Sequence, residues 1–304
     1  MDYVLTTHAL SKHYGHFKAL NSLTMHVPKG AIYGLVGRNG AGKTTLIRLI
    51  CALQPPTSGG YALYGVRPSD PRIHTVRRRM GAVVETPSIY LDMTAEENLR
   101  IHSRILGLPS ETGIPELLSL VGLENTGKKK AKHFSLGMKQ RLGIAVALVG
   151  DPDFLVLDEP TNGLDPQGII EMRELIMRLN RERHITVLIS SHILDELSRL
   201  ATHYGFIDGG RMVKEISAQE LEAVCRKCVR LTVSDTAVLA RVLDGMALDY
   251  QILSGTQADL FAAPNITQLV LALAQEGCEV QAVKERDESL ESYFISLVGG
   301  GKYA

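Results

Sequence analysis

A glycine-rich stretch that begins at Gly37 has the residue types and the spacing of a phosphate-binding loop, G-x-x-x-x-G-K-T. Gly40 and Gly42 lack a Cβ atom, so the backbone can turn tightly and point successive N–H groups at a phosphate. Lys43 then offers a positive charge to the β- and γ-phosphates, and the Thr44 hydroxyl is placed to bind Mg²⁺. The loop predicts a nucleoside triphosphate site whose contacts are Gly37, Arg38, Asn39, Gly40, Ala41, Gly42, Lys43, Thr44 and Thr45.

Two consecutive carboxylates form a second reactive group. Asp158 and Glu159 follow the apolar run Phe154–Leu157, which is typical of a buried strand. Acids at the carboxyl end of such a strand lie where open α/β sheets bind ligands. We expect Asp158 to hold Mg²⁺, directly or through water, and Glu159 to orient and polarise the water that attacks the γ-phosphate. Base catalysis of this kind typically contributes ~10²- to 10⁴-fold.

The sequence pattern predicts alternating strands and helices as the elements that position these groups. A strand over residues 31–36 precedes the phosphate loop, and the apolar face of residues 45–53 predicts a helix after it. The loop would therefore place phosphates at a helix N-terminus, whose unpaired N–H groups favour anions. Further buried strands are expected over 81–85, 154–158 and 185–190, which indicates a mainly parallel sheet covered by helices.

Other segments surround this core. Residues 3–10 and 20–27 predict an antiparallel β flap before the phosphate loop. From about residue 87 to 150 the pattern is helical, beginning with a capping box at Thr94 and Glu97. Beyond residue 215 the order β-α-β-β-α-β suggests a small ferredoxin-like unit. We expect a nucleotide-binding domain over 1–215, with a helical subdomain at about 87–150, and an accessory α+β domain over 216–304.

Composition narrows the classes of partner. The 304 residues hold 33 Lys and Arg against 33 Asp and Glu, so a net charge of zero gives no reason to expect nucleic acid as a partner. Apolar stretches are far shorter than the roughly 18–20 residues that cross a bilayer, and the first residues lack the pattern of a secretory signal. Among the four cysteines, Cys225 and Cys228 form a lone C-x-x-C, which is weak evidence for zinc or redox chemistry. These features predict a reduced, cytoplasmic protein.

The stretch from Ser135 to Ala145 identifies a family. Ser135 is a good N-cap for a helix over 136–149, which alone would be an ordinary amphipathic helix. Placed before Asp158 and after the phosphate loop, Phe134-Ser-Leu-Gly-Met138 resembles the signature of ATP-binding cassette (ABC) proteins, usually L-S-G-G-Q. Leu136 and Met138 depart from that pattern, but the serine and the second glycine are present. The resemblance covers about residues 2–215.

The resemblance implies a P-loop NTPase fold, an ABC ATPase core that uses ATP and Mg²⁺. It also implies roles for single residues. Tyr14 would stack on adenine, and His192 would reach the γ-phosphate as the switch histidine. Ser135 and Gly137 would contact the γ-phosphate held by another subunit, and Asn162–Asp165 would form the D-loop. Asp165 also suits a helix N-cap because proline follows it.

One position departs from the family in an informative way. Where cassettes usually carry a glutamine that serves Mg²⁺ and its waters, this chain has Glu85, which can offer an oxygen but adds a charge and lacks the amide donor. Together with the signature and with Leu290-Glu-Ser-Tyr-Phe294, this resembles the ATPases of bacitracin and lantibiotic self-protection exporters. The resemblance implies an ATP-sandwich homodimer on the inner face of the membrane that powers a separate permease.

Two other functions fit the same motifs. A cassette protein acting on DNA would need long coiled-coil arms, and the stretch from Lys43 to Ser135 is too short for them. Ribosome-acting members normally carry two cassettes in one chain, whereas one phosphate loop is found here. A nucleotide sensor that does not hydrolyse ATP would have no need of Glu159 and His192. We therefore expect a transport ATPase.

Overall fold

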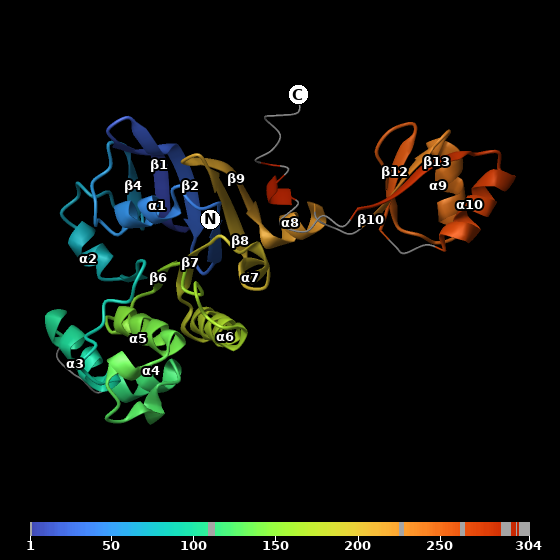
Figure 1. The fold of residues 1–304 in the computed structure, drawn as a ribbon. Helices are drawn as coiled ribbons and strands as arrows, with labels where there is room; N and C mark the ends of the chain where they lie inside the picture. The colour runs from blue at the N-terminus through green and yellow to red at the C-terminus, as the bar shows by residue number, and fades with distance from the viewer. Residues whose placement is uncertain are drawn as a thin grey trace. The chain divides into compact units, whose positions relative to one another are not determined.

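The computed structural model describes residues 2–108, 113–224, 228–261, 265–286, 293–295 and 297 (Figure 1). The chain forms two compact units, Met1–Ala218 and Gln219–Gly299. Cys225 of the C-x-x-C pair and residues 290–292 of the stretch Leu290–Phe294 lie outside the described residues.

A six-stranded sheet forms the centre of the first unit. Five strands run parallel, and β9 lies antiparallel at one edge. From edge to edge the strands are β5 (Met80–Val83), β6 (Phe154–Asp158), β7 (Thr186–Ser191), β3 (Ile32–Val36), β8 (His203–Asp208) and β9 (Arg211–Ser217). β3, β6 and β7 are buried along their whole length, as expected for strands covered on both faces. Because these three are parallel neighbours, the loops that follow them meet at one edge.

Each face of this sheet has its own cover. On one face, Leu46 of α1 and Leu23 of β2 share a buried cluster with Phe154 of β6. That cover comprises α1 (Lys43–Ile50) and an antiparallel sheet of β2 (Phe17–Pro28), β1 (Tyr3–Tyr14) and β4 (Ser58–Leu63). On the other face, α6 (Pro166–Arg183) and α7 (Leu194–Ser198) contact β7. The short helix α2 (Ile73–Arg77) follows β4.

The predicted helical segment contains α3 (Ala95–Ile105), α4 (Ile114–Leu120) and α5 (Leu136–Leu148), with short 3₁₀ turns η1 (Glu124–Thr126) and η2 (Ala131–His133). These helices lie together, away from the antiparallel sheet (Figure 1). The predicted capping box is confirmed: Thr94 Oγ1 accepts from the Glu97 N–H at 3.2 Å, and Glu97 Oε2 accepts from the Thr94 N–H at 2.8 Å. Within the described ranges, no helix has both the length and the apolar character to span a membrane.

The second unit begins in α8 (Ala218–Val224), and the elements after this helix have the predicted order β-α-β-β-α-β. Its antiparallel sheet has the strand order β11-β12-β10-β13. The elements are β10 (Cys228–Val233), α9 (Thr236–Gly245), β11 (Tyr250–Ile252), β12 (Gln257–Leu260), α10 (Ile266–Gln275) and β13 (Val280–Arg286). Leu231 of the sheet packs in one buried cluster with Leu239 of α9 and Leu269 of α10. The unit thus has a hydrophobic core of its own.

Candidate nucleotide site

The glycine-rich loop joins the carboxyl end of β3 to the first residue of α1. Gly42 is the N-cap residue and has φ +108°, and Gly40 has φ +80°. A Cβ atom at Gly42 would lie 2.6 Å from the Ala19 carbonyl oxygen, so the position has no room for a side chain. The loop therefore depends on glycine for both backbone conformation and space. Its N–H groups precede a helix N-terminus, the arrangement that binds phosphate.

Lys43 connects this loop to the carboxylates of β6. Its side chain is only 4% exposed, and Nζ donates to the Gly37 carbonyl oxygen at 2.7 Å. The same nitrogen lies 3.4 Å from Glu159 Oε1. The structure thus brings together two groups that lie far apart in the sequence and that were both predicted to act on the γ-phosphate.

Glu159 also contacts the predicted switch histidine. Its Oε2 lies 3.1 Å from His192 Nδ1, so one carboxylate bridges a lysine and an imidazole. The backbone of Glu159 has φ +47°, a conformation that costs energy for a residue with a side chain. Such strain persists where surrounding contacts enforce it, commonly at functional sites. The geometry suits a group that must be held in one orientation.

Ser190 is a site residue for which the sequence predicted no role. It is the next-to-last residue of β7 and fully buried. Its Oγ donates to Asp158 Oδ1 at 2.6 Å and accepts from the Glu159 N–H at 2.9 Å. One hydroxyl therefore orients both acids. Its position at the end of a predicted strand, beside the strand that carries Asp158, was the available signal.

The residues predicted to hold Mg²⁺ suit that ion in donor type. A hydroxyl from Thr44 and a carboxylate from Asp158 are hard oxygen ligands, and Mg²⁺ usually takes one or two carboxylates together with substrate phosphates. Asp158 is almost fully buried, and Ser190 engages Oδ1. In the part of the chain that the structure describes, no hydrogen bond engages Asp158 Oδ2, which is thus free to face a cation. No cluster of three or more His, Cys, Asp or Glu side chains among those residues could hold a metal ion alone.

Glu85, the third predicted Mg²⁺ ligand, follows β5 and lies at the same edge of the sheet. Its carboxylate forms an ion pair with Arg48 of α1, and both side chains are partly exposed. Like Glu159, Glu85 has a positive φ, +60°. Arg48 had no predicted role, yet it neutralises the charge that distinguishes Glu85 from glutamine. The carboxylate that stands in place of the usual glutamine is thus paired with an arginine.

The remaining predicted residues lie around this centre. Tyr14 ends β1 with a side chain that is 44% exposed, and its hydroxyl donates to Gln54. Ser135 caps α5 by accepting from the Met138 N–H at 3.2 Å, and Asp165 caps α6 by accepting from the Gly168 N–H at 3.0 Å.

The signature and the D-loop adjoin each other. A Cβ atom at Gly163 would lie 3.1 Å from Leu136 Cδ2, so the start of α5 lies against this loop. Within one chain the structure brings together the phosphate loop, Asp158, Glu159 and His192. Among the described residues, no hydrogen bond joins Ser135, Gly137 or Asp165 to the phosphate loop of the same chain, although the D-loop begins beside Glu159, whose carbonyl oxygen accepts from the Asn162 N–H.

Comparison with known proteins agrees with this geometry. The family model for "ABC transporter" matches residues 20–162. The bacitracin transport ATP-binding protein BcrA of Enterococcus faecalis is 39% identical over an alignment of 306 positions that covers 100% of this chain and 99% of that protein. The lantibiotic transport ATP-binding protein SrtF of Streptococcus pyogenes is 44% identical over 206 residues, 68% of this chain and 87% of that protein.

Solved structures give the same result. One described as "Structure of ATP binding subunit of ABC transporter" superposes with a TM-score of 0.63 at 32% identity, covering 73% of this chain and 92% of its own. The chain therefore belongs to the ABC transporter family and is one of its ATP-binding ATPase subunits.

Proposed function

We propose that this chain hydrolyses ATP to power an exporter that removes a peptide antibiotic of the bacitracin or lantibiotic kind. The observation that carries the proposal is the position of Glu159, whose carboxylate lies 3.4 Å from Lys43 Nζ and 3.1 Å from His192 Nδ1. A base held between a phosphate-binding lysine and a histidine is suited to activating water at the γ-phosphate.

Different residues bind the nucleotide, activate the water and stabilise the transition state. The loop of Gly37–Thr45 and the start of α1 hold the β- and γ-phosphates, and Tyr14 stacks on the adenine ring. Glu159 orients and polarises a water whose oxygen attacks the γ-phosphorus while the bond to the β–γ bridging oxygen breaks, which yields ADP and phosphate. His192 donates to the γ-phosphate and so stabilises the charge that develops there.

Mg²⁺ would be held by Thr44 and Asp158, with Glu85 near its waters. When bound, the ion neutralises phosphate charge and orients the β- and γ-oxygens. Ser190 supports this arrangement by fixing Asp158. Arg48 supports it by balancing the charge of the Glu85 carboxylate.

A second copy of the chain completes each site. The exposed Ser135 and the neighbouring Gly137 lie at the N-terminus of α5, where helix N–H groups and the dipole favour an anion. Because no bond joins them to their own phosphate loop, we assign them to the nucleotide of the partner. The dimer would lie on the cytoplasmic face of the membrane and drive a separate permease.

The cargo class follows from the relatives. Proteins named for bacitracin and lantibiotic transport match this chain at 39% and 44% identity. We assign residues 1–215 to the nucleotide-binding domain and 216–304 to an accessory domain, in keeping with the separate cores of the two units. The permease would supply the contacts that select the peptide.

The test replaces the proposed base. Glu159→Gln keeps the shape of the side chain but cannot accept a proton, so we expect phosphate release to fall about 10²- to 10⁴-fold while ATP binding persists. Glu182→Gln, on the exposed surface of α6, is the matched control and should hydrolyse ATP at the wild-type rate. Gel filtration with Mg²⁺ and ATP should show the Glu159 variant trapped as a dimer.

The cargo is tested in cells that express the chain with its permease. Wild-type protein should raise resistance to bacitracin or to a lantibiotic, and Glu159→Gln should abolish the gain. Normal ATPase activity in the Glu159 variant would reject the assigned base. Active ATPase without protection from either class of peptide would reject the cargo.

A further inference from the structure

Side-chain hydrogen bonds join the carboxyl ends of β6 and β7 and the segments that follow these two strands. Ser190 bonds to Asp158 and to the backbone of Glu159, and His192 bonds to the Glu159 side chain. A fourth bond joins Thr161 to Glu196, and the proposed hydrolysis does not use it.

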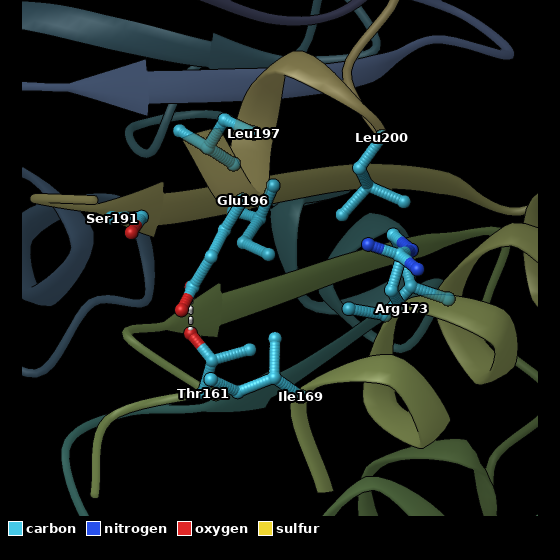
Figure 2. Close-up of a pocket in the computed structure, with 9 residues that line it drawn as sticks. Thr161, Ile169, Arg173, Ser191, Glu196, Leu197 and Leu200 are labelled. Carbon is cyan, nitrogen blue, oxygen red and sulfur yellow. Dashed lines mark hydrogen bonds between the residues drawn. The ribbon is translucent and has the colours of Figure 1, made fainter. Parts of the chain in front are cut away.

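Figure 2 shows the bond and its surroundings. Thr161 is only 8% exposed and immediately precedes the D-loop, Asn162–Asp165. Its hydroxyl donates to a carboxylate oxygen of Glu196. Glu196 lies on α7, the helix that begins at Leu194, two residues after His192. The bond therefore links the entrance of the D-loop to the helix that carries the switch histidine into place.

The surroundings of this bond are largely apolar and tightly packed. The adjacent cavity has a volume of only about 10 Å³, which is at the lower limit for one water molecule. Its lining includes Ile169, Ile176, Ile189, Leu197 and Leu200. Arg173 also lines this cavity, and the Thr161–Glu196 bond is partly buried, so water has limited access to the Glu196 oxygen. A hydrogen bond to a carboxylate in such surroundings is stronger than one on the surface.

Helix α7 needs an anchor of this kind. It comprises only Leu194–Ser198, and a helix this short is not stable by itself in water. Leu197 is buried and fixes one side of the helix, while Glu196 fixes the side toward the D-loop. His192 lies two residues before the first residue of α7, so only a short stretch of chain separates it from this helix.

From this geometry we propose that Thr161 and Glu196 are positioning residues that couple the D-loop to the switch histidine of the same chain. The coupling rests on the function proposed above. The D-loop packs against Leu136 at the start of α5. Both belong to the surface that we assign to contact with the nucleotide of the partner copy. A D-loop displaced by partner and nucleotide moves Thr161, and Glu196 transfers that movement to α7 and His192. Hydrolysis then proceeds only when the sandwich is closed.

The experiment compares variants that keep or remove the bond. Thr161→Val preserves the shape of the side chain but loses the hydroxyl, whereas Thr161→Ser retains it. Ser198→Ala is the matched control, because Ser198 lies on α7 and donates to Asp195 within the same helix rather than to the D-loop. Steady-state phosphate release gives kcat and KM, and a fluorescent ATP analogue gives nucleotide affinity.

Coupling predicts a particular pattern. Thr161→Val should lower kcat about 10- to 100-fold, since small displacements of catalytic groups cost this much, with KM and nucleotide affinity nearly unchanged. Thr161→Ser should restore most of kcat. Glu196→Ala should match Thr161→Val, and the double variant should be no worse than either, as expected for two ends of one bond.

Other outcomes would overturn the inference. If Thr161→Val lowers the melting temperature but leaves kcat at the wild-type and Ser198→Ala values, the bond only stabilises the fold. If Thr161→Val does not fold, Glu196→Gln gives the same test, because it keeps an acceptor oxygen and the fold but weakens the bond. If the wild-type chain does not hydrolyse ATP, the proposed function is rejected together with the coupling. If the wild type is active and the variants have an unchanged kcat, only the coupling is rejected.

Discussion

A single buried hydroxyl, that of Ser190, orients both acids at the end of β6. Changing Ser190→Ala leaves Asp158 without its donor and the Glu159 N–H without its acceptor. Partners that orient metal ligands typically affect activity 10- to 100-fold, so we expect kcat to fall by about that factor. The Mg²⁺ concentration that gives half-maximal phosphate release should also rise.

Phosphate release across a Mg²⁺ titration measures both effects, and circular dichroism checks that the variant is folded. An unchanged Mg²⁺ dependence would remove Asp158 from the set of ligands that Ser190 supports. Unchanged kcat as well would show that neither acid needs this hydroxyl.

At the scale of single residues, spacing predicted the segments of the site but not the bonds between them. Lys43 and Glu159 were each predicted from a local motif, and the structure places their side chains 3.4 Å apart. Ser190, Arg48 and Thr161 were not predicted, because each acts through a partner on another element. Such pairs depend on the order of strands in the sheet, which local sequence does not specify.

At the scale of elements, the start of α1 depends on the backbone of Gly42. Gly42→Ala would force a residue with a Cβ to adopt φ +108° and would bring that atom within 2.6 Å of the Ala19 carbonyl oxygen. Left-handed conformations cost about 1–2 kcal/mol per residue even without a clash. We therefore expect Gly42→Ala to lower the free energy of unfolding by more than this and to abolish measurable ATP binding.

Gly30→Ala separates the two causes. Gly30 has φ +79°, but a Cβ there would meet no atom within 4 Å. That variant should lose only about 1–2 kcal/mol of stability and keep its affinity for ATP. Urea unfolding and fluorescent nucleotide binding on both variants make the comparison. Full ATP binding by Gly42→Ala would show that the loop tolerates a side chain at the helix start.

Elements with a strong local signal were predicted well. The helix expected over 136–149 is α5, Leu136–Leu148, and the capping box at Thr94 forms as expected. Strand β4 was not predicted, because the Gly-Gly pair in Ser58–Leu63 resembles a loop and only its pairing with β1 makes it a strand. Helix α7 was also missed, since five residues carry too little periodicity to register.

At the scale of the whole molecule, the chain has two separate hydrophobic cores, one in each unit. We expect calorimetry to resolve two unfolding transitions, because each core can unfold without the other. ATP with Mg²⁺ at about 100 times the dissociation constant should raise only the transition of Met1–Ala218, by roughly 5–10 °C. The Glu159→Gln background prevents hydrolysis during the scan.

Removal of the metal supplies the control. With EDTA in place of Mg²⁺, ATP should raise the unfolding temperature of the first unit by less, since the phosphates then lose the cation that helps to hold them. The transition of the second unit serves as the internal reference and should stay constant throughout. A single transition that nucleotide moves as a whole would contradict the independence of the two cores.

The left-handed backbone at Glu159 limits how this ATPase can be made more heat-resistant. Glycine would relax the torsion there, yet it would also delete the proton acceptor, so thermal tolerance gained at this position would be paid for in turnover. Consensus-style engineering should therefore leave residue 159 untouched and draw its gains from exposed helix positions or from the loops of the second unit.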